Sequence, residues 1–181
     1  MKLGWACMLK LLSLCEREGI CFFWRPLDPD NQQLLGMYFR TPTGVPVIVL
    51  DESLINRIKT ARTVLAEELA HYWTVPMVDH MNCRVDDPLT KVNVWRDESR
   101  ALRLATNLLI PTVELVAALN KGVYSHHELS EYFMVEEYVV QRKMNLLRID
   151  LHEQMKLREV APYIAELFLG DMEQIEQNEA S

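Results

Sequence analysis

The sequence is poor in several features that common functional sites require. It has only six glycines in 181 residues, and they are scattered, so no glycine-rich loop is available to bind phosphate groups. Its four cysteines include no CxxC pair, which argues against a zinc ribbon, and we interpret them as buried, reduced thiols. Lys and Arg number 19 against 26 for Asp and Glu, giving a formal net charge of −7. This acidic balance argues against direct binding of nucleic acid and suits a basic protein partner better.

A long hydrophobic run is also absent. The apolar residues near the N-terminus are interrupted by Lys10 and followed by charged residues, and no small-residue cleavage site is visible. We therefore expect neither a membrane span nor a signal peptide, and we predict a cytoplasmic protein. The same apolar residues recur at helical spacing and predict an amphipathic helix over residues 3–18, which Gly19 ends.

After this first helix, the pattern changes to short strands and then to further helices. Runs of apolar residues between turn clusters predict a small, mostly antiparallel sheet of three strands, over residues 20–24, 35–39 and 45–50. Beyond them, helical spacing of apolar residues predicts helices over residues 54–73, 94–110, 112–119, 126–133, 136–148 and 151–169. The predicted class is therefore α+β, with one small sheet and a mainly helical remainder.

The chain is expected to divide into a core and a smaller helical unit. Its composition, 49% hydrophobic and 25% charged, suits one globular domain with a small addition. We place the core at residues 1–122 and a unit of helix-turn-helix size, packed on that core, at residues 123–170. Residues 171–181 contain acidic residues but no Lys or Arg and predict an acidic tail.

The helix predicted over residues 54–73 carries ionisable residues at the spacing of metal ligands. Glu67 and His71 are four residues apart, so they lie one helical turn apart on one face and can reach the same ion. Glu68 stands where the HExxH helix of zinc proteases has its general base, although that motif begins with His rather than Glu. A carboxylate is an acceptable zinc ligand, but a second anionic ligand should raise the pKa of a water bound to the metal.

Spacing of this kind also occurs by chance on solvated helix faces, so its surroundings matter. Apolar residues at 64–66 and aromatic residues at 72–73 flank the motif and bury the helix. Ionisable groups on a buried helix are unfavourable unless they are paired or bound to a metal. The helix also follows a strand-rich segment, and the next helix offers Glu98 as a third ligand. These features favour a metal site over a solvated face.

These residues resemble the ImmA/IrrE family of bacterial metallo-endopeptidases. The segment that begins at Glu98 is similar to the family pattern E-x-x-A-x-x-x-A, with Ala101 and Ala105 at the two alanine positions. Residues 129–135, LSEYFMV, resemble the family segment L-A-x-x-F-x-V, and the likeness covers roughly residues 8–148. A variant of the motif helix that begins with Glu-Glu is familiar within the family, so Glu67 agrees with the resemblance.

The resemblance implies a zincin-like α+β fold and a zinc-dependent or manganese-dependent metallo-endopeptidase. By position it implies Glu67, His71 and Glu98 as metal ligands and Glu68 as the general base. The implied substrate is a regulatory protein, typically a helix-turn-helix repressor, whose cleavage relieves repression in phage, mobile elements or stress responses. The C-terminal helical unit would then serve as the docking surface for that repressor.

Three other functions remain open at this point. A non-catalytic regulator with a zincin fold could bind and inactivate a repressor without cleaving it, since Glu67 could mark a weakened site. A carboxylate-bridged di-metal protein would require a second Glu-x-x-His element, which the chain lacks. A DNA-binding regulator that uses residues 126–148 is disfavoured because several Glu residues offset the basic residues of that segment.

Overall fold

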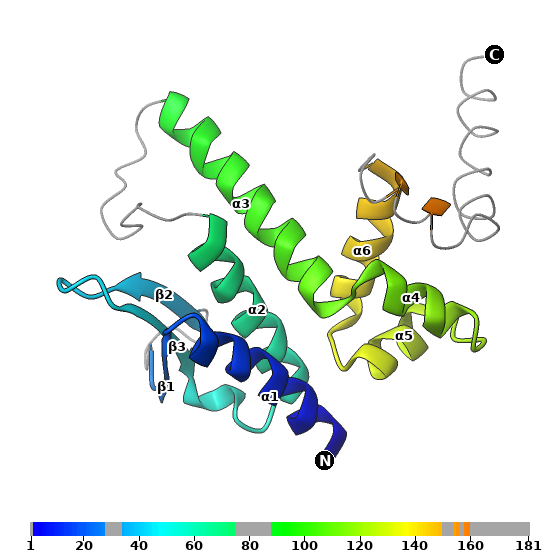
Figure 1. The fold of residues 1–181 in the computed structure, drawn as a ribbon, viewed down its shortest axis with the longest axis horizontal. Helices are drawn as coiled ribbons and strands as arrows, with labels where there is room; N and C mark the ends of the chain where they lie inside the picture. Colours follow the sequence, from blue (N-terminus) through cyan, green and yellow to red (C-terminus); the bar gives the residue numbers. More distant parts are fainter. Residues whose placement is uncertain (1, 28–33, 75–87, 150–153, 156–157, 160–181) are drawn as a thin grey trace. The chain divides into compact units, whose positions relative to one another are not determined.

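The computed structural model describes residues 2–27, 34–74, 88–149, 154–155 and 158–159. Within these ranges it contains six α-helices and one three-stranded sheet, which confirms the predicted α+β class (Figure 1). Contacts along the chain divide it into two units. Unit 1 is Met1–Leu109 together with Met134–Glu136, and unit 2 is Ile110–Phe133 together with Glu137–Ser181. The sequence predicts a boundary near residue 122.

The sheet of unit 1 has its last strand in the middle. Strands β1 (Cys21–Arg25), β2 (Gly36–Arg40) and β3 (Pro46–Asp51) lie in the order β1-β3-β2. β2 pairs with β3 antiparallel, but β1 pairs with β3 parallel, so the sheet is mixed and the prediction of a mostly antiparallel sheet is wrong in this respect. The reason is topological: β1 and β2 run in opposite directions, and a strand inserted between them must be parallel to one of the two.

Helix α2 is the centre of unit 1. The helices of unit 1 are α1 (Lys2–Arg17), the short 3-10 helix η1 (Glu52–Leu54), α2 (Ile58–Thr74) and α3 (Pro88–Leu109). α2 contacts β2, β3, α1 and α3, and Figure 1 shows it between the sheet and α3. The four consecutive apolar residues of β3, Val47 to Leu50, are buried, as expected for the central strand. α2 is therefore held on several sides, which fixes the side chains that it carries.

The end of α1 follows the expected pattern of a glycine C-cap. Gly19 has a φ of 69°, in the left-handed region. The N–H of Ile20 donates to the carbonyl of Cys15 at 2.8 Å, and the N–H of Gly19 donates to the carbonyl of Glu16 at 3.1 Å. These two bonds form a Schellman motif, which satisfies carbonyls at the helix end and directs the chain into β1.

A short turn from later in the chain also belongs to unit 1. Val135 is fully buried, and the Arg62 guanidinium donates to the carbonyl of Met134 at 2.6 Å. The Thr60 hydroxyl donates to the carboxylate of Glu136 at 2.7 Å. Met134 has a φ of 53°, which is uncommon for a residue other than glycine. The first half of α2 thus holds this turn by side-chain hydrogen bonds from two of its residues.

Unit 2 consists, in its described part, of three short helices. α4 (Thr112–Leu119) and α5 (His126–Phe133) have the predicted bounds, and α6 (Glu137–Ile149) begins one residue later than predicted. Ser125 and Glu128 form a capping box: the Glu128 N–H donates to the Ser125 hydroxyl at 3.1 Å, and the Ser125 N–H donates to the Glu128 carboxylate at 3.0 Å. The helix predicted over residues 151–169 lies largely outside the described residues, and the acidic tail lies wholly outside them.

The cysteines differ in part from the expectation that they are buried. Cys15 is buried, but Cys7 is half-buried and Cys21 is exposed.

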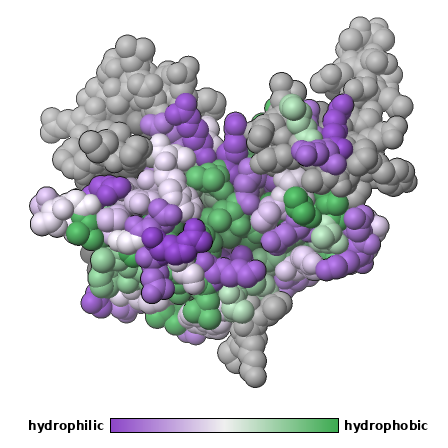
Figure 2. Space-filling view, viewed as in Figure 1, coloured by the Kyte–Doolittle hydropathy of each residue, from purple (hydrophilic) through white to green (hydrophobic). Residues whose placement is uncertain are grey.

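Within the described ranges no single helix is long and apolar enough to cross a membrane, and Asp97–Leu109 and Thr112–Leu119 meet that criterion only when they are counted together. On the face shown in Figure 2, exposed apolar side chains lie among polar ones.

Candidate metal centre

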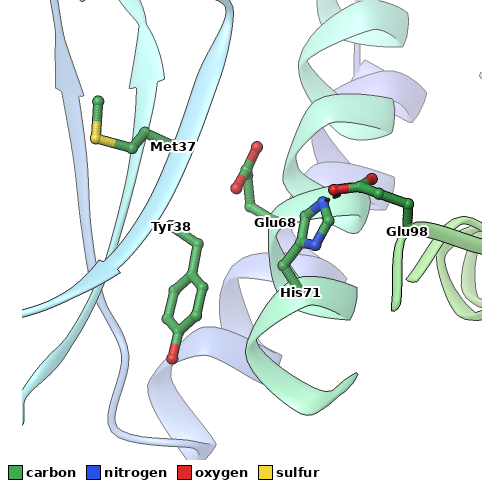
Figure 3. A pocket seen from close by; sticks show the side chains of 5 residues that line it. All are labelled: Met37, Tyr38, Glu68, His71 and Glu98. Atoms are coloured by element: carbon green, nitrogen blue, oxygen red, sulfur yellow. Dashed lines mark ion pairs between the residues drawn. The ribbon is translucent and has the colours of Figure 1, made fainter. Parts of the chain in front are cut away.

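A cavity of about 240 Å³ in unit 1 brings the predicted site residues together. Three elements line it: the edge strand β2, helix α2 and helix α3. Its lining residues are Met37, Tyr38, Glu68, His71 and Glu98 (Figure 3). The predicted base and two of the three predicted ligands therefore face one open space.

The position of each acidic or basic group follows from helix geometry. Glu68 and His71 are three residues apart on α2, so their side chains leave the same face of the helix. Glu68 points toward β2, whereas the His71 ring points toward Glu98 on α3 (Figure 3). α2 thus presents the Glu68 carboxyl on the strand side of the cavity and the His71 imidazole on the α3 side.

The His71 and Glu98 side chains lie at a distance compatible with one shared ion. The Nε2 atom of His71 is 3.8 Å from Oε2 of Glu98. Two ligands at about 2.0–2.2 Å from a tetrahedral zinc ion are roughly 3.4 Å apart, so a shift of a few tenths of an ångström would suffice. The same distance also suits an ion pair when His71 is protonated. His71 and Glu98 thus suit two coordination positions of a single metal ion.

Glu68 is enclosed between α2 and β2. The backbone N–H of Tyr38 donates a hydrogen bond to its carboxylate, and Gly36 lies directly against its side chain. Burial is the largest of the effects that raise the pKa of the Glu68 carboxyl from 4.5 to about 8; the negative charges of Glu67 and Glu98 act in the same direction, and the Tyr38 hydrogen bond opposes them. A carboxyl with a pKa near neutrality can exchange protons at physiological pH, as a general acid or base must.

Glu67 occupies a different place from the other predicted site residues. It is half-buried but is not among the residues that line the cavity. Within the described part of the chain, no three His, Cys, Asp or Glu side chains are arranged to hold a metal ion. The assignment of Glu67 as the third ligand therefore stays a prediction.

The contribution of β2 to the site was not predicted from the sequence. Met37 and Tyr38 line the cavity, and Gly36 gives α2 room to approach the strand. A glycine in a strand can mark a place where another part of the chain comes close, and this was the one available signal. Which element would approach Gly36 depends on tertiary packing, which a single sequence does not display.

Comparison with known proteins identifies the family. No curated protein matches the chain significantly, and no solved structure does so either. The family model for the IrrE N-terminal-like domain, Peptidase_M78, matches residues 15–145. This match spans well over half of the chain and includes all the residues that line the cavity. The match confirms the resemblance found in the sequence, and it implies a metal cofactor in general terms. The chain accordingly belongs to the IrrE N-terminal-like family and carries a metallopeptidase-like domain.

Proposed function

We propose that this protein is a metal-dependent endopeptidase that cleaves a regulatory protein, namely a helix-turn-helix repressor. The observation that carries the proposal is the convergence of Glu68, His71 and Glu98 on one cavity of a chain in a metallopeptidase-like family. Acidic and imidazole side chains from two different helices meet there, next to the edge strand of the sheet. That arrangement supplies both a binding place for a cation and a base beside it.

The residues that would hold the metal are His71 and Glu98, with Glu67 as the third ligand. The 3.8 Å separation of the first two supports their role, and the motif spacing supports Glu67. An imidazole nitrogen and carboxylate oxygens suit zinc, and manganese is the second candidate. A divalent ion bound there would lower the pKa of a water molecule and polarise the substrate carbonyl.

Glu68 performs the proton transfers in this proposal. Its carboxylate takes a proton from the attacking water and later delivers a proton to the leaving amine of the cleaved peptide bond. Its pKa of about 8 makes it a stronger base than an ordinary carboxylate. A positive charge beside His71 and Glu98 would lower this pKa toward neutrality, where both protonation states are well populated.

The position of β2 supports an extended peptide as substrate. β2 lies at the edge of the three-stranded sheet, and Met37 and Tyr38 on this strand line the cavity. An edge strand can receive a further extended chain by backbone hydrogen bonds. A loop of a regulatory protein that aligned with β2 would bring its backbone beside Glu68.

A non-catalytic regulator that binds a repressor without cleaving it is the second candidate. Three observations favour it, and the first two concern Glu67, which replaces the first His of the usual motif and does not line the cavity. Within the described residues the side chains also do not form a set of three metal ligands. A weakened site on an intact scaffold is what such a regulator would show.

Co-expression with candidate helix-turn-helix repressors, beginning with any that a neighbouring gene encodes, tests both candidates. We expect a cleaved repressor fragment with the wild-type protein and none with Glu68→Gln, which should still bind one equivalent of zinc. Glu52→Gln is the matched control, because Glu52 is an exposed carboxylate outside the cavity. A repressor that is bound but intact, together with protein that holds no stoichiometric metal, would overturn the enzyme proposal in favour of the regulator.

A further inference from the structure

Gly36 lies where strand β2 comes close to helix α2. A Cβ atom added at this position would meet the side chain of Val64, and it would lie 3.0 Å from Oε1 and 3.2 Å from Cγ of Glu68. The φ of Gly36 is not in the left-handed region, so any residue could adopt its backbone conformation. It is the space beside α2, and not backbone freedom, that requires glycine here.

The same stretch of β2 also binds the Glu68 carboxylate directly. Tyr38, two residues beyond Gly36, donates its backbone N–H to that carboxylate. A hydrogen bond from an N–H to a carboxylate is stronger than one to a neutral acceptor, and it defines a direction as well as a distance. Strand β2 therefore affects the Glu68 side chain in two ways: Gly36 leaves space for it, and the N–H of Tyr38 donates to its carboxylate.

We propose that Gly36 is a positioning residue of the site, because the space left by its missing side chain lets Glu68 lie against β2 and receive the Tyr38 N–H. The role of Glu68 as base, on which the importance of this placement rests, comes from the proposed function. The placement itself can be tested without any activity.

A packing role for Gly36 is the alternative, and Val64 separates the two. Val64 is a buried residue of α2 that does not line the cavity. In the double variant Gly36→Ala/Val64→Ala, the new methyl group no longer meets the valine side chain, but it still lies against Glu68. Packing should therefore recover in the double variant, whereas the placement of Glu68 should not.

The amide proton of Tyr38, followed by NMR in the full-length metal-free protein, reports the placement. Glu68→Ala gives the chemical shift of this amide without its carboxylate acceptor. We expect Gly36→Ala/Val64→Ala to move the Tyr38 signal at least half of the way to that reference and to melt at a higher temperature than Gly36→Ala. Val64→Ala alone should leave the signal near its wild-type position. A double variant that keeps the wild-type Tyr38 signal would overturn the proposal and leave Gly36 with a packing role only.

Cleavage assays add a second, separable readout. If the wild-type protein cleaves its repressor, the double variant should lose roughly 100-fold in kcat, because a misplaced catalytic group of this kind lowers the rate by about that factor. KM and zinc affinity should stay near wild type, since His71 and Glu98 lie on the other side of the cavity. A normal kcat in the double variant would contradict the positioning role. Absence of cleavage by the wild type would instead count against the proposed function, and the NMR result would stand by itself.

Discussion

The two halves of helix α2 are continuous in sequence but have different surroundings. In the first half, residues 61–66 are all buried, including the polar residues Arg62 and Thr63. In the second half, Glu67, Glu68 and residues 71–74 are half-buried, and the helix borders an open cavity. Leu69 and Ala70 remain buried in this half, so one face still packs while the other faces the cavity.

This difference separates a half of the helix that is packed from a half that borders the cavity. The first half uses its polar groups to hold the turn at residues 134–136, through Thr60 and Arg62. The second half places its ionisable groups where burial and neighbouring charge alter the pKa of Glu68. Substitutions in the first half should therefore change stability, and those in the second half should change metal binding and activity.

The largest expected effect is on metal affinity, in the second half. Glu98→Ala should lower zinc affinity on the order of 100-fold, since even residues that only support metal ligands contribute 10–100-fold. Isothermal titration with zinc measures this directly. Asp97→Ala is the control, because Asp97 precedes Glu98 on α3 but does not line the cavity. An unchanged affinity in Glu98→Ala would remove Glu98 from the ligand set, and the same titration of Glu67→Ala decides the third ligand.

The sequence predicted the elements well where local signals mark their ends. The bounds of α5 agree with the structure because Ser125 caps this helix, whereas α4 begins after Pro111 without a side-chain cap. The end of α1 agrees within one residue for the same reason, since Gly19 is a C-cap that can be recognised from sequence. Each of these signals acts within a few residues, so a single sequence contains it.

Features that depend on contacts distant in sequence were not predicted. The parallel pairing of β1 with β3 depends on which strand occupies the centre of the sheet, and short connections alone do not decide this. The approach of Gly36 to Glu68 joins residues 32 positions apart. Helical spacing places both Glu67 and Glu68 near the site, but packing against β2 determines that Glu68 lines the cavity. The motif spacing therefore identified Glu67 and Glu68 as candidates, but only tertiary packing decided which of the two lines the cavity.

In the first half of α2, the corresponding prediction concerns stability. Arg62→Leu should lower the free energy of unfolding by about 2–3 kcal/mol, because the carbonyl of Met134 would lose a hydrogen bond from the buried, charged side chain of Arg62. Urea denaturation measures this value. Arg57→Leu, at an exposed position before α2, should change it by less than about 0.5 kcal/mol. Zinc affinity should be unaffected by Arg62→Leu, and a loss comparable with that of Glu98→Ala would show that the two halves are coupled.

The last expected effect is the pH dependence of stability that Glu68 contributes in metal-free protein. Its pKa is about 8 in the folded protein and near 4.5 for a free carboxyl, so the folded state holds a proton that the unfolded state releases between these two values. Stability must therefore fall as pH rises through this window, and no penalty remains below pH 4.5. Glu68→Gln removes the titrating group, so its melting temperature should exceed that of the wild type at pH 8, and the difference should shrink to almost nothing at pH 4.5. Glu52→Gln, at an exposed position, should show no such pH-dependent difference. If the difference in melting temperature between Glu68→Gln and the wild type grew toward acidic pH instead, Glu68 would be stabilised as the anion. The second half of α2 would then lack the carboxyl with a raised pKa that distinguishes it from the first.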